Sequence, residues 1–512
     1  MSSGGESEEA VPVSERTYTN PVHSGYLGDP FVLKHNGEYY AYGTTPAAEK
    51  LVIPVPHSRD LVGWRPLGVA LTLHDDAFEA LWAPEVAYDN GTFYMYYSAG
   101  GSEGEGHRLR VATATHPAGP FEDGGVVLTP EEPFTIDAHP FCDDDGQWYL
   151  YYCRDFLDSE GGQRVGTGIV VDRLLGMTRL AGEPTTVMRP HAGWQLYERQ
   201  RVWYGRVWDW YTVEGPFVRE RGGAYYCFYS GGAWKEPNYG VSYVIADHPL
   251  GPFVSEGDAG GPKLLRTRPG KVIGPGHASL THAPDNAQEY IVYHAWDPQH
   301  TARLMRIDRL DWDQQGPSSP APTLDPQPAP PLPAFRDWFD GPDGAPPNPF
   351  TWRIEGGDWQ LQGGELVQQD AEARPAAALL TGVPLGENYL FEASVRLLKS
   401  RDERGRYGVC LGHSSGSITS LTLAADGTLP LGDGRRGVRE GSASHTNLRK
   451  LGSGFRGDAY HRLLVSLRGG EAEVRLEGVR VASGLEVPPD VSGVGLFTWG
   501  AAAAFDGVSV QK

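Results

Sequence analysis

The chain has 512 residues, with 67 glycines, 41 prolines, 11% aromatic residues and a formal net charge of −21. This length predicts two or three domains, and the composition favours many short strands joined by tight turns over a helical bundle or a doubly wound fold. A negative surface repels phosphate backbones, so nucleic acid is not expected as a partner.

The chain opens with a polar, acidic segment, Met1 to Glu15, which has no apolar core of the kind found in a secretory signal. No later stretch is apolar for long enough to span a membrane. We therefore expect a cytoplasmic protein without a membrane partner, or a secreted one whose signal has been removed. The sequence predicts no oligomeric state.

Four cysteines occur, and none forms a CxxC pair, so neither a zinc site nor a redox motif is indicated. Cys142 and Cys153 flank one predicted hairpin and could meet there. We favour buried free thiols in a reducing compartment.

An aromatic strand pattern recurs five times, each copy beginning with turn residues and continuing with alternating aromatics. The copies are 36–43, 90–97, 145–152, 222–229 and 288–294. Asn-Gly and Asp-Gly before an aromatic run predict the second arm of a β-hairpin. Two near-duplicate segments, 115–121 and 247–253, predict the same inter-strand turn in two units. Five repeated β-units indicate an all-β fold with a five-bladed β-propeller over residues 18–313, in preference to unrelated hairpins in a sandwich.

A proline-rich segment, 314–334, follows the repeats and predicts an extended, semi-rigid linker. Beyond it, strands such as 389–396 and 461–468 alternate simply and predict a β-sandwich over 335–512. This part resembles the concanavalin-like or laminin-G-like sandwiches attached to glycosidases. Such a domain binds sugar or braces the propeller, and we favour bracing because no separate site is readable in it.

Three carboxylates stand just before predicted hairpins, among apolar, glycine and proline neighbours. Asp29 precedes the first hairpin, Asp137 the third and Glu214 the fourth. A single acid of this kind favours a turn or cap, but three at comparable places in a repeat favour catalysis. Hydrolysis of a glycosidic bond generally uses two carboxyl groups, an acid and a base, and a propeller can bring them to its axis from different blades.

Several motifs then occur in a familiar order along the first three-fifths of the chain. They are Asn20-Pro21, Gly28-Asp-Pro-Phe31, Gly37-Glu-Tyr-Tyr40, Ser58 to Trp64, Trp82-Ala-Pro-Glu-Val86, Ile136-Asp137 and Val213-Glu-Gly-Pro216. Together they resemble the signatures of glycoside hydrolase family 43. The resemblance implies an inverting mechanism, with Asp29 as the general base, Glu214 as the general acid and Asp137 as the residue that tunes the acid. Inversion predicts that the carboxyls of the base and the acid stand about 6.5–9.5 Å apart, against about 5–5.5 Å for retention.

The resemblance also suggests supporting residues. His277, in Gly274-Pro-Gly-His, is similar to an axial histidine that lies near a calcium ion or a water in relatives, and a hydrogen-bonded core histidine is an equal alternative. Arg303 is expected at the substrate or on a solvated strand. Trp82 and Glu85 are expected to bind substrate at the pocket wall, and Glu85 is expected to order that wall without reacting.

A long insertion, 155–221, carries several aromatic residues shortly before Glu214, and one or two of them are expected to join Trp82 in walling the sugar subsite. The resulting hypothesis is an exo-acting glycoside hydrolase that releases terminal α-L-arabinofuranose from oligosaccharides derived from plant polysaccharides. A β-D-xylosidase of the same family and a non-catalytic carbohydrate-binding propeller are the alternatives.

Overall fold

The structure is a computed structural model, and it describes residues 16–46, 51–73, 77–255, 257–414, 417–424, 427–429, 431–433, 455–487 and 493–512. The acidic N-terminal segment of the sequence lies outside these residues. Nearly every element is a strand, and the helical ones are two short 3-10 turns, η1 (Glu160–Gly162) and η2 (Gly193–Gln195). Among the described residues, no helix has the length and apolar character needed to cross a bilayer.

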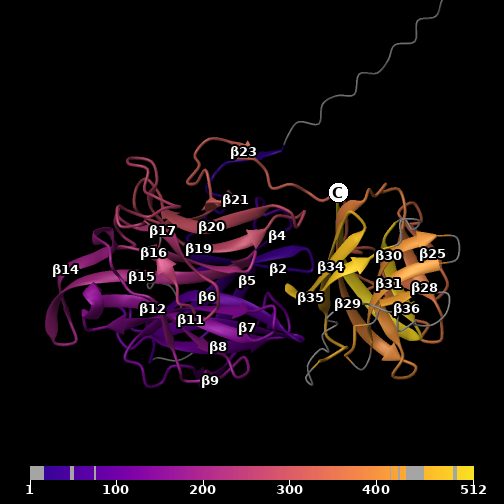
Figure 1. Ribbon diagram of the computed structural model, residues 1–512, viewed down its shortest axis with the longest axis horizontal. Helices are drawn as coiled ribbons and strands as arrows, with labels where there is room; N and C mark the ends of the chain where they lie inside the picture. Colours follow the sequence, from indigo (N-terminus) through magenta and orange to yellow (C-terminus); the bar gives the residue numbers. More distant parts are fainter. Residues whose placement is uncertain are drawn as a thin grey trace, which may run out of the picture.

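The first part of the chain forms a five-bladed β-propeller, as the sequence predicts. Three blades are separate four-stranded sheets, and blades 3 and 4 are joined into one nine-stranded sheet by a short pairing of β12 with β15. Figure 1 shows the propeller beside the C-terminal part. Blade 1 contains β2 (Gly28–His35), β3 (Glu38–Thr44), β4 (Val52–Ser58) and β5 (Arg65–Thr72). Blade 2 contains β6 (Ala80–Asp89), β7 (Thr92–Gly100), β8 (Arg108–Ala114) and β9 (Glu122–Val127). Blade 3 contains β10 (Thr135–Cys142), β11 (Trp148–Phe156), β12 (Gly166–Arg173) and β13 (Thr185–Met188). Blade 4 contains β15 (Arg206–Arg221), β16 (Ala224–Gly231), β17 (Gly240–Ala246) and β18 (Val254–Ser255). Blade 5 contains β19 (Ile273–His282), β20 (Glu289–Trp296), β21 (Arg303–Asp313) and β22 (Gly316–Ser318).

The five aromatic copies are the second strands of the blades, and their composition follows from burial on both faces. Tyr40 and Tyr42 of β3 pack against blade 2, whereas Tyr39 of the same strand packs against blade 5. Each pair of neighbouring blades encloses its own buried apolar cluster, so five clusters close the ring. Large flat rings fill these wedge-shaped gaps, which explains why aromatic residues dominate both sides of the strand.

Closure of the ring depends on the segment before β2. The side-chain amide of Asn20 donates to the carbonyl of Ile307 on β21 at 2.7 Å, and its oxygen accepts from the Ile307 amide at 3.0 Å. The amide of Leu27 then donates to the carbonyl of Arg303 on the same strand. The Asn-Pro motif at the start of the chain therefore joins the first blade to the last.

The predicted linker is held against the propeller along much of its length. Its first residues form β22, the outer strand of blade 5, and Thr323 is buried beside Asn20, whose amide donates to the threonine hydroxyl at 3.1 Å. Farther along, β23 (Gln327–Pro328) pairs with β1 (Thr17–Tyr18). Proline density keeps this segment extended, and the extended backbone lies along the last blade instead of bridging open space.

The C-terminal part is a β-sandwich of an eight-stranded and a six-stranded sheet. The first sheet contains β24 (Phe335–Asp337), β26 (Trp359–Gln362), β27 (Glu365–Gln368), β29 (Asn388–Ser400), β33 (His461–Arg468), β34 (Glu471–Leu476), β35 (Val479–Glu486) and β37 (Ala501–Gln511). The second contains β25 (Trp352–Glu355), β28 (Ala376–Leu380), β30 (Arg406–Ser414), β31 (Ser417–Ala424), β32 (Leu431–Asp433) and β36 (Gly495–Trp499). One buried apolar cluster fills the space between them, and the simple alternation of the strands reflects this single buried face.

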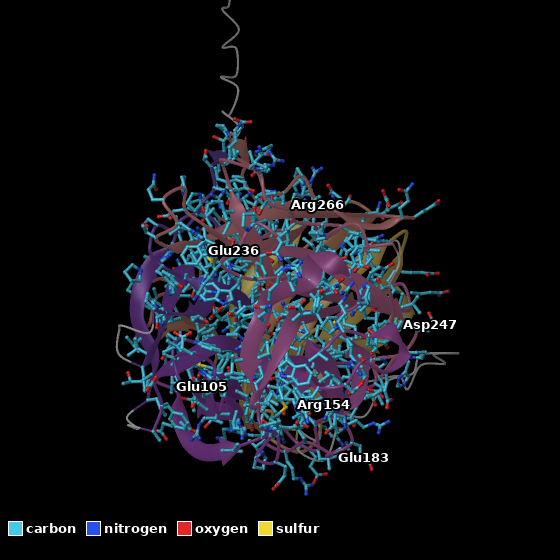
Figure 2. All side chains as sticks on the ribbon, turned by 90° about the vertical axis from the view of Figure 1, so that its left-hand side faces the viewer. Glu105, Arg154, Glu183, Glu236, Asp247 and Arg266 are labelled. Atoms are coloured by element: carbon cyan, nitrogen blue, oxygen red, sulfur yellow. The ribbon has the colours of Figure 1, made fainter. Side chains whose placement is uncertain are left out.

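The sandwich packs against the hairpin turns at one end of the propeller. The hydroxyl of Tyr88 donates to the carbonyl of Tyr460 at 2.6 Å, the amide of Arg480 donates to Asp144 at 3.0 Å, and a Cβ on Gly37 would stand 3.1 Å from the Trp338 ring. Viewed from the opposite end, the propeller lies in front of the sandwich (Figure 2). These contacts suit the bracing role.

No disulfide joins Cys142 to Cys153; Cys153, Cys227 and Cys410 are buried, and Cys142 is half-buried. The structure therefore agrees with the preference for thiols over a bridge between Cys142 and Cys153.

Candidate active site

Every blade begins with the same irregularity in its innermost strand. A β-bulge interrupts the pairing of the first two strands at one equivalent register position in all five blades. The residue at this position has a backbone φ between 46° and 59° in each blade. These residues are Asp29, Ala83, Asp137, Gly215 and His277. Bulges bend a strand and re-aim its side chains, and strained backbone of this kind gathers at functional sites.

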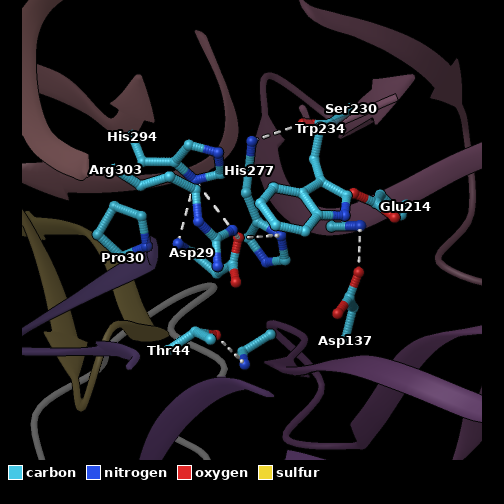
Figure 3. A network of polar contacts seen from close by, with 12 residues as sticks. Asp29, Pro30, Thr44, Asp137, Glu214, Ser230, Trp234, His277, His294 and Arg303 are labelled. Carbon is cyan, nitrogen blue, oxygen red and sulfur yellow. Dashed lines mark hydrogen bonds and ion pairs between the residues drawn. The ribbon is translucent and has the colours of Figure 1, made fainter. Parts of the chain in front are cut away.

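Hydrogen bonds between blades hold the bulges in place (Figure 3). The amide of Ala83 donates to the Thr44 hydroxyl of blade 1 at 2.9 Å, and the amide of His277 donates to the Ser230 hydroxyl of blade 4 at 2.7 Å. The amide of Asp29 donates to Nδ1 of His294 at 3.1 Å. The backbone at the axis is thus fixed by side chains of neighbouring blades.

The three predicted catalytic carboxylates converge at this end of the axis and line one pocket of about 290 Å³. Asp29 and Asp137 occupy the bulge position itself. Glu214 lies one residue earlier, because Gly215 takes the bulge position in blade 4. The sequence repeat alone suggested three equivalent positions, and the register corrects that for Glu214. A longer side chain from the preceding residue reaches the same space.

Asp29 is surrounded by nitrogen atoms. Its Oδ1 lies 2.7 Å from Nη1 of Arg303, 3.4 Å from Nδ1 of His277 and 3.3 Å from Nδ1 of His294. Burial alone would raise the pKa of Asp29, but the Arg303 guanidinium and the two imidazoles more than offset it and hold the pKa well below its usual range. Asp29 is therefore ionised at any physiological pH.

Glu214 has the opposite electrostatic environment. Burial, opposed by a hydrogen bond from the Tyr239 hydroxyl at 2.7 Å and assisted by the charge of Asp29, raises the pKa of Glu214 to about 7. Asp137 accepts from the Gly215 amide at 2.9 Å, and burial together with the charges of Glu214 and Asp29 raises its pKa well above the usual value. Two carboxyls this close cannot both ionise easily, so a proton is retained between Asp137 and Glu214 at neutral pH.

Arg303, expected either at the substrate or on a solvated strand, is 6% exposed and lines the pocket. Its Nε donates to the Tyr26 hydroxyl at 2.9 Å, and its guanidinium stacks on Trp234 with 4.6 Å to the ring centroid. A Cβ on Gly28 would overlap the guanidinium, so the glycine before Asp29 is needed for the ion pair to form.

Trp82 lines the pocket, as expected, and its ring stacks on His107 with centroids 3.8 Å apart. Of the aromatic residues in the insertion, Tyr197 lines the pocket. It lies on β14 (Leu196–Trp203), which forms an extra hairpin with β15 beside blade 4.

Glu85 is not among the residues that line the pocket, which differs from the expectation that it binds substrate there. It lies two residues past the bulge, where its buried carboxylate bonds Nδ1 of His139 at 2.7 Å, and Nε2 of that histidine accepts from the Val218 amide at 3.0 Å. The chain of contacts ties blades 2, 3 and 4 together. Glu85 orders the wall from behind, as the sequence analysis expected of its role.

Sequence reasoning missed three residues. Trp234 lines the pocket and stacks on Trp296, while Tyr239 donates to the acid and His294 accepts from the base. Trp234 follows the fourth aromatic strand directly, and that position was a usable signal. Nothing in the local sequence singles out Tyr239 or His294, because each matters only through a partner that is distant in sequence: Glu214, 25 residues earlier in the same blade, for Tyr239, and Asp29, on another blade, for His294.

Among the residues that the structure describes, those around His277 do not fit a direct calcium cage. One ligand atom each from Asp137, Glu214 and His277 lies within 4.8 Å of the other two. Calcium prefers six to eight oxygen ligands, whereas this group offers an imidazole nitrogen and two carboxyls that retain a proton. An indirect contact from His277 through water remains a proposal, tested by chelation below.

Comparison with known proteins agrees with the fold. The sequence model described as "Glycosyl hydrolases family 43" matches residues 18–317, which include all five blades. The chain belongs to this family. It is therefore a glycoside hydrolase.

Individual relatives of this family 43 hydrolase have differing names. The chain is 30% identical over 331 residues to a "Beta-D-galactofuranosidase xynD" of Aspergillus niger, covering 60% of this chain and 86% of that protein. It is 28% identical over 297 residues to an "Extracellular exo-alpha-(1->5)-L-arabinofuranosidase" of Streptomyces chartreusis, covering 54% of this chain and 82% of that protein. A solved thermostable family-43 glycoside hydrolase is similar with a TM-score of 0.54 and 34% identity, covering 62% of this chain and 99% of that one.

Proposed function

We propose that this protein is an inverting, exo-acting hydrolase that releases terminal α-L-arabinofuranose from oligosaccharides derived from plant polysaccharides. The proposal rests on one observation: the pocket shifts the pKa values of two carboxyls in opposite directions. Arg303 keeps the pKa of Asp29 well below its usual range, while burial raises the pKa of Glu214 to about 7. An ionised and a protonated carboxyl in one pocket are the base and the acid that glycoside hydrolysis uses.

In the proposed reaction, Asp29 accepts a proton from a water molecule as the water oxygen bonds to the anomeric carbon. Glu214 donates its proton to the glycosidic oxygen as the bond between that oxygen and the anomeric carbon breaks. One proton is taken up and one is given, so the enzyme returns to its starting state by exchange with solvent. Asp29 is a weak base because of Arg303, and it suffices because water attacks a carbon with oxocarbenium character.

Asp137 has a positioning role in this scheme. Its Oδ2 accepts from the amide of Gly215, the residue after the acid, and so fixes the backbone next to Glu214. The proton that the two carboxyls retain links the ionisation of one to that of the other. Neutral His277 stands between Asp29 and Glu214 (Figure 3), because burial lowers its pKa. The base and the acid thus face the pocket from opposite sides of one imidazole.

Exo action is supported by the shape of the lining. All five blades contribute side chains to the pocket, and three bulge residues line it near the axis: Asp29, Asp137 and His277. A pocket closed at the axis receives the end of a chain more readily than its middle. The choice of arabinofuranose follows the exo-arabinofuranosidase relative, and the galactofuranosidase relative makes β-D-galactofuranose a second substrate to test beside β-D-xylose.

The test compares a nitrophenyl glycoside of each sugar with an arabinofuranosyl oligosaccharide. A nitrophenolate leaves with little assistance, so Glu214→Ala is expected to lose far more activity on the oligosaccharide than on the nitrophenyl arabinofuranoside, while Asp29→Asn loses activity on both. Unchanged activity of Glu214→Ala on the oligosaccharide would refute the assignment of the acid. NMR of the first-formed sugar is expected to show an inverted anomer, and a retained anomer would overturn the mechanism.

A further inference from the structure

Two basic side chains, Arg201 and Lys235, line the pocket on the side of blade 4. Arg201 lies on β14, which pairs with β15, the strand that carries Glu214. Lys235 follows β16 of the same blade, next to Trp234. Both cations therefore stand on the side of the pocket that holds the acid. Their charge is opposite in sign to the formal net charge of the chain, −21.

The guanidinium of Arg201 is held in place by aromatic rings. It lies 4.4 Å from the ring centroid of Trp203, 5.1 Å from that of Tyr197 and 5.4 Å from that of Trp210. Its side chain is 18% exposed, so the charge is largely withdrawn from water. Stacking on ring faces orients a guanidinium but uses none of its N–H donors.

Those donors have little to bind within the protein. Arg201 donates no hydrogen bond to any residue that the structure describes, and the one carboxylate within 4 Å among them, Glu198, lies 3.8 Å away and is 55% exposed. The nearby carboxylate of Asp155 attracts the charge of Arg201 but accepts its hydrogen bonds from Thr167, Trp203 and Tyr204. A half-buried guanidinium with free donors on a pocket wall is a binding group without its ligand.

Lys235 adds a second positive charge at the rim. Its Nζ stands 4.7 Å from the ring centroid of Trp234, and it forms no ion pair with a described residue. Arg303, the third cation of the pocket, differs because Asp29 neutralises it at 2.7 Å. The one exposed acid in the lining, Glu103, belongs to the loop after blade 2's second strand, away from blade 4.

We propose that the leaving-group side of the pocket binds a sugar residue that carries a carboxylate, a uronic acid, with Arg201 as its bidentate partner and Lys235 as a nearby point charge. The inference rests on the proposed function, because Glu214 protonates the leaving oxygen and the leaving group must therefore lie on its side. A planar carboxylate matches the two parallel N–H donors of a guanidinium. Ordinary neutral sugars offer hydroxyls instead, and they are the competing occupant that the experiment distinguishes.

The experiment uses two oligosaccharides that differ in one group. In both, the sugar to be released is attached to a uronic acid residue, and in the second the carboxylate is converted to its methyl ester. Wild type is expected to hydrolyse the acid form with kcat/KM at least about tenfold above the ester, since a charge-assisted hydrogen bond contributes on the order of one to two powers of ten. The ratio is expected to fall as salt rises.

Single substitutions test which side chain produces the preference for the acid form. Arg201→Gln is expected to bring the ratio of kcat/KM for the acid form to kcat/KM for the ester near one. Arg201→Lys is expected to keep part of the preference, because the positive charge remains while the two parallel N–H donors of the guanidinium are lost. Lys235→Gln, at an exposed position that the fold tolerates, is expected to reduce the ratio several-fold and serves if Arg201→Gln does not fold. Arg199→Gln is the matched control, because Arg199 lies on the same strand, is 72% exposed and faces Asp209 at 3.4 Å, and it is expected to keep the wild-type ratio.

The outcomes separate this inference from the proposed function. Hydrolysis of nitrophenyl glycosides by wild type tests the enzyme without a leaving-group sugar. If wild type hydrolyses them but has the same kcat/KM for the acid and the ester oligosaccharides, the proposed binding of a uronic acid is wrong and neutral hydroxyls are the ligands of Arg201. If wild type hydrolyses none of them, the proposed function itself fails. An acid preference that survives in both Arg201→Gln and Lys235→Gln would also overturn the assignment.

Discussion

The hydrogen bond from Tyr239 to Glu214 leads to a prediction about the pH dependence of the enzyme. The hydroxyl donates to Oε1 at 2.7 Å, and this bond favours the ionised form of the acid. Tyr239→Phe removes the donor and retains the ring, which stacks near His294 with centroids 5.9 Å apart. We therefore expect the substitution to raise the pKa of Glu214 above its present value of about 7.

The size of the shift follows from the strength of the bond. A hydrogen bond to a charged group contributes about 1.5–3 kcal/mol, and one pKa unit corresponds to about 1.4 kcal/mol. The pKa of Glu214 should thus rise by about 1–2 units. The acid must be protonated to act, so the alkaline limb of kcat/KM should move to higher pH by the same amount, even if the rate at the optimum falls.

The assay is a pH profile of kcat/KM on an arabinofuranosyl oligosaccharide, which needs the acid. Tyr26→Phe is the control, because the Tyr26 hydroxyl accepts from Arg303 and does not touch the acid. It should leave the alkaline limb in place. An alkaline limb of Tyr239→Phe that is unchanged or moves to lower pH would refute the reasoning.

Three further predictions concern the supports of the site. Arg303→Met leaves the carboxylate of Asp29 buried without its cation, so the free energy of unfolding measured with urea should fall by about 3–5 kcal/mol. The control is Arg309→Met, at a 59% exposed position, which should change the free energy of unfolding by less than about 0.5 kcal/mol. Equal losses in the two variants would contradict the ion-pair argument. In Gly276→Ala the new Cβ would overlap the Tyr239 ring, so kcat is expected to fall about tenfold or more with the fold intact by circular dichroism, and wild-type kcat would show that the ring need not stay in place. If calcium lies near the axial histidine, EDTA should lower Tm and added calcium should restore it, whereas an unchanged Tm would remove the calcium proposal.

The repeat and the catalytic candidates were predictable from sequence because they depend on local patterns. The aromatic strands had to be buried on both faces wherever they packed, and the turn residues before them fixed the hairpins. Asp29, Asp137 and Glu214 stood out because each precedes a copy of that strand. The position of Glu85 was not predictable in this way. It lies two residues past the β-bulge, where its side chain contacts His139 of the next blade instead of lining the pocket.

The sequence by itself therefore determined the blade count, the sandwich and the three carboxyls, since local patterning and spacing encode them. Only the tertiary structure decided which carboxyl is ionised. Arg303 reaches Asp29 across 274 residues, and Tyr239 reaches Glu214 from the loop before β17 of blade 4. A pKa depends on burial and on charges a few ångströms away, and neither quantity exists until the blades close around the axis.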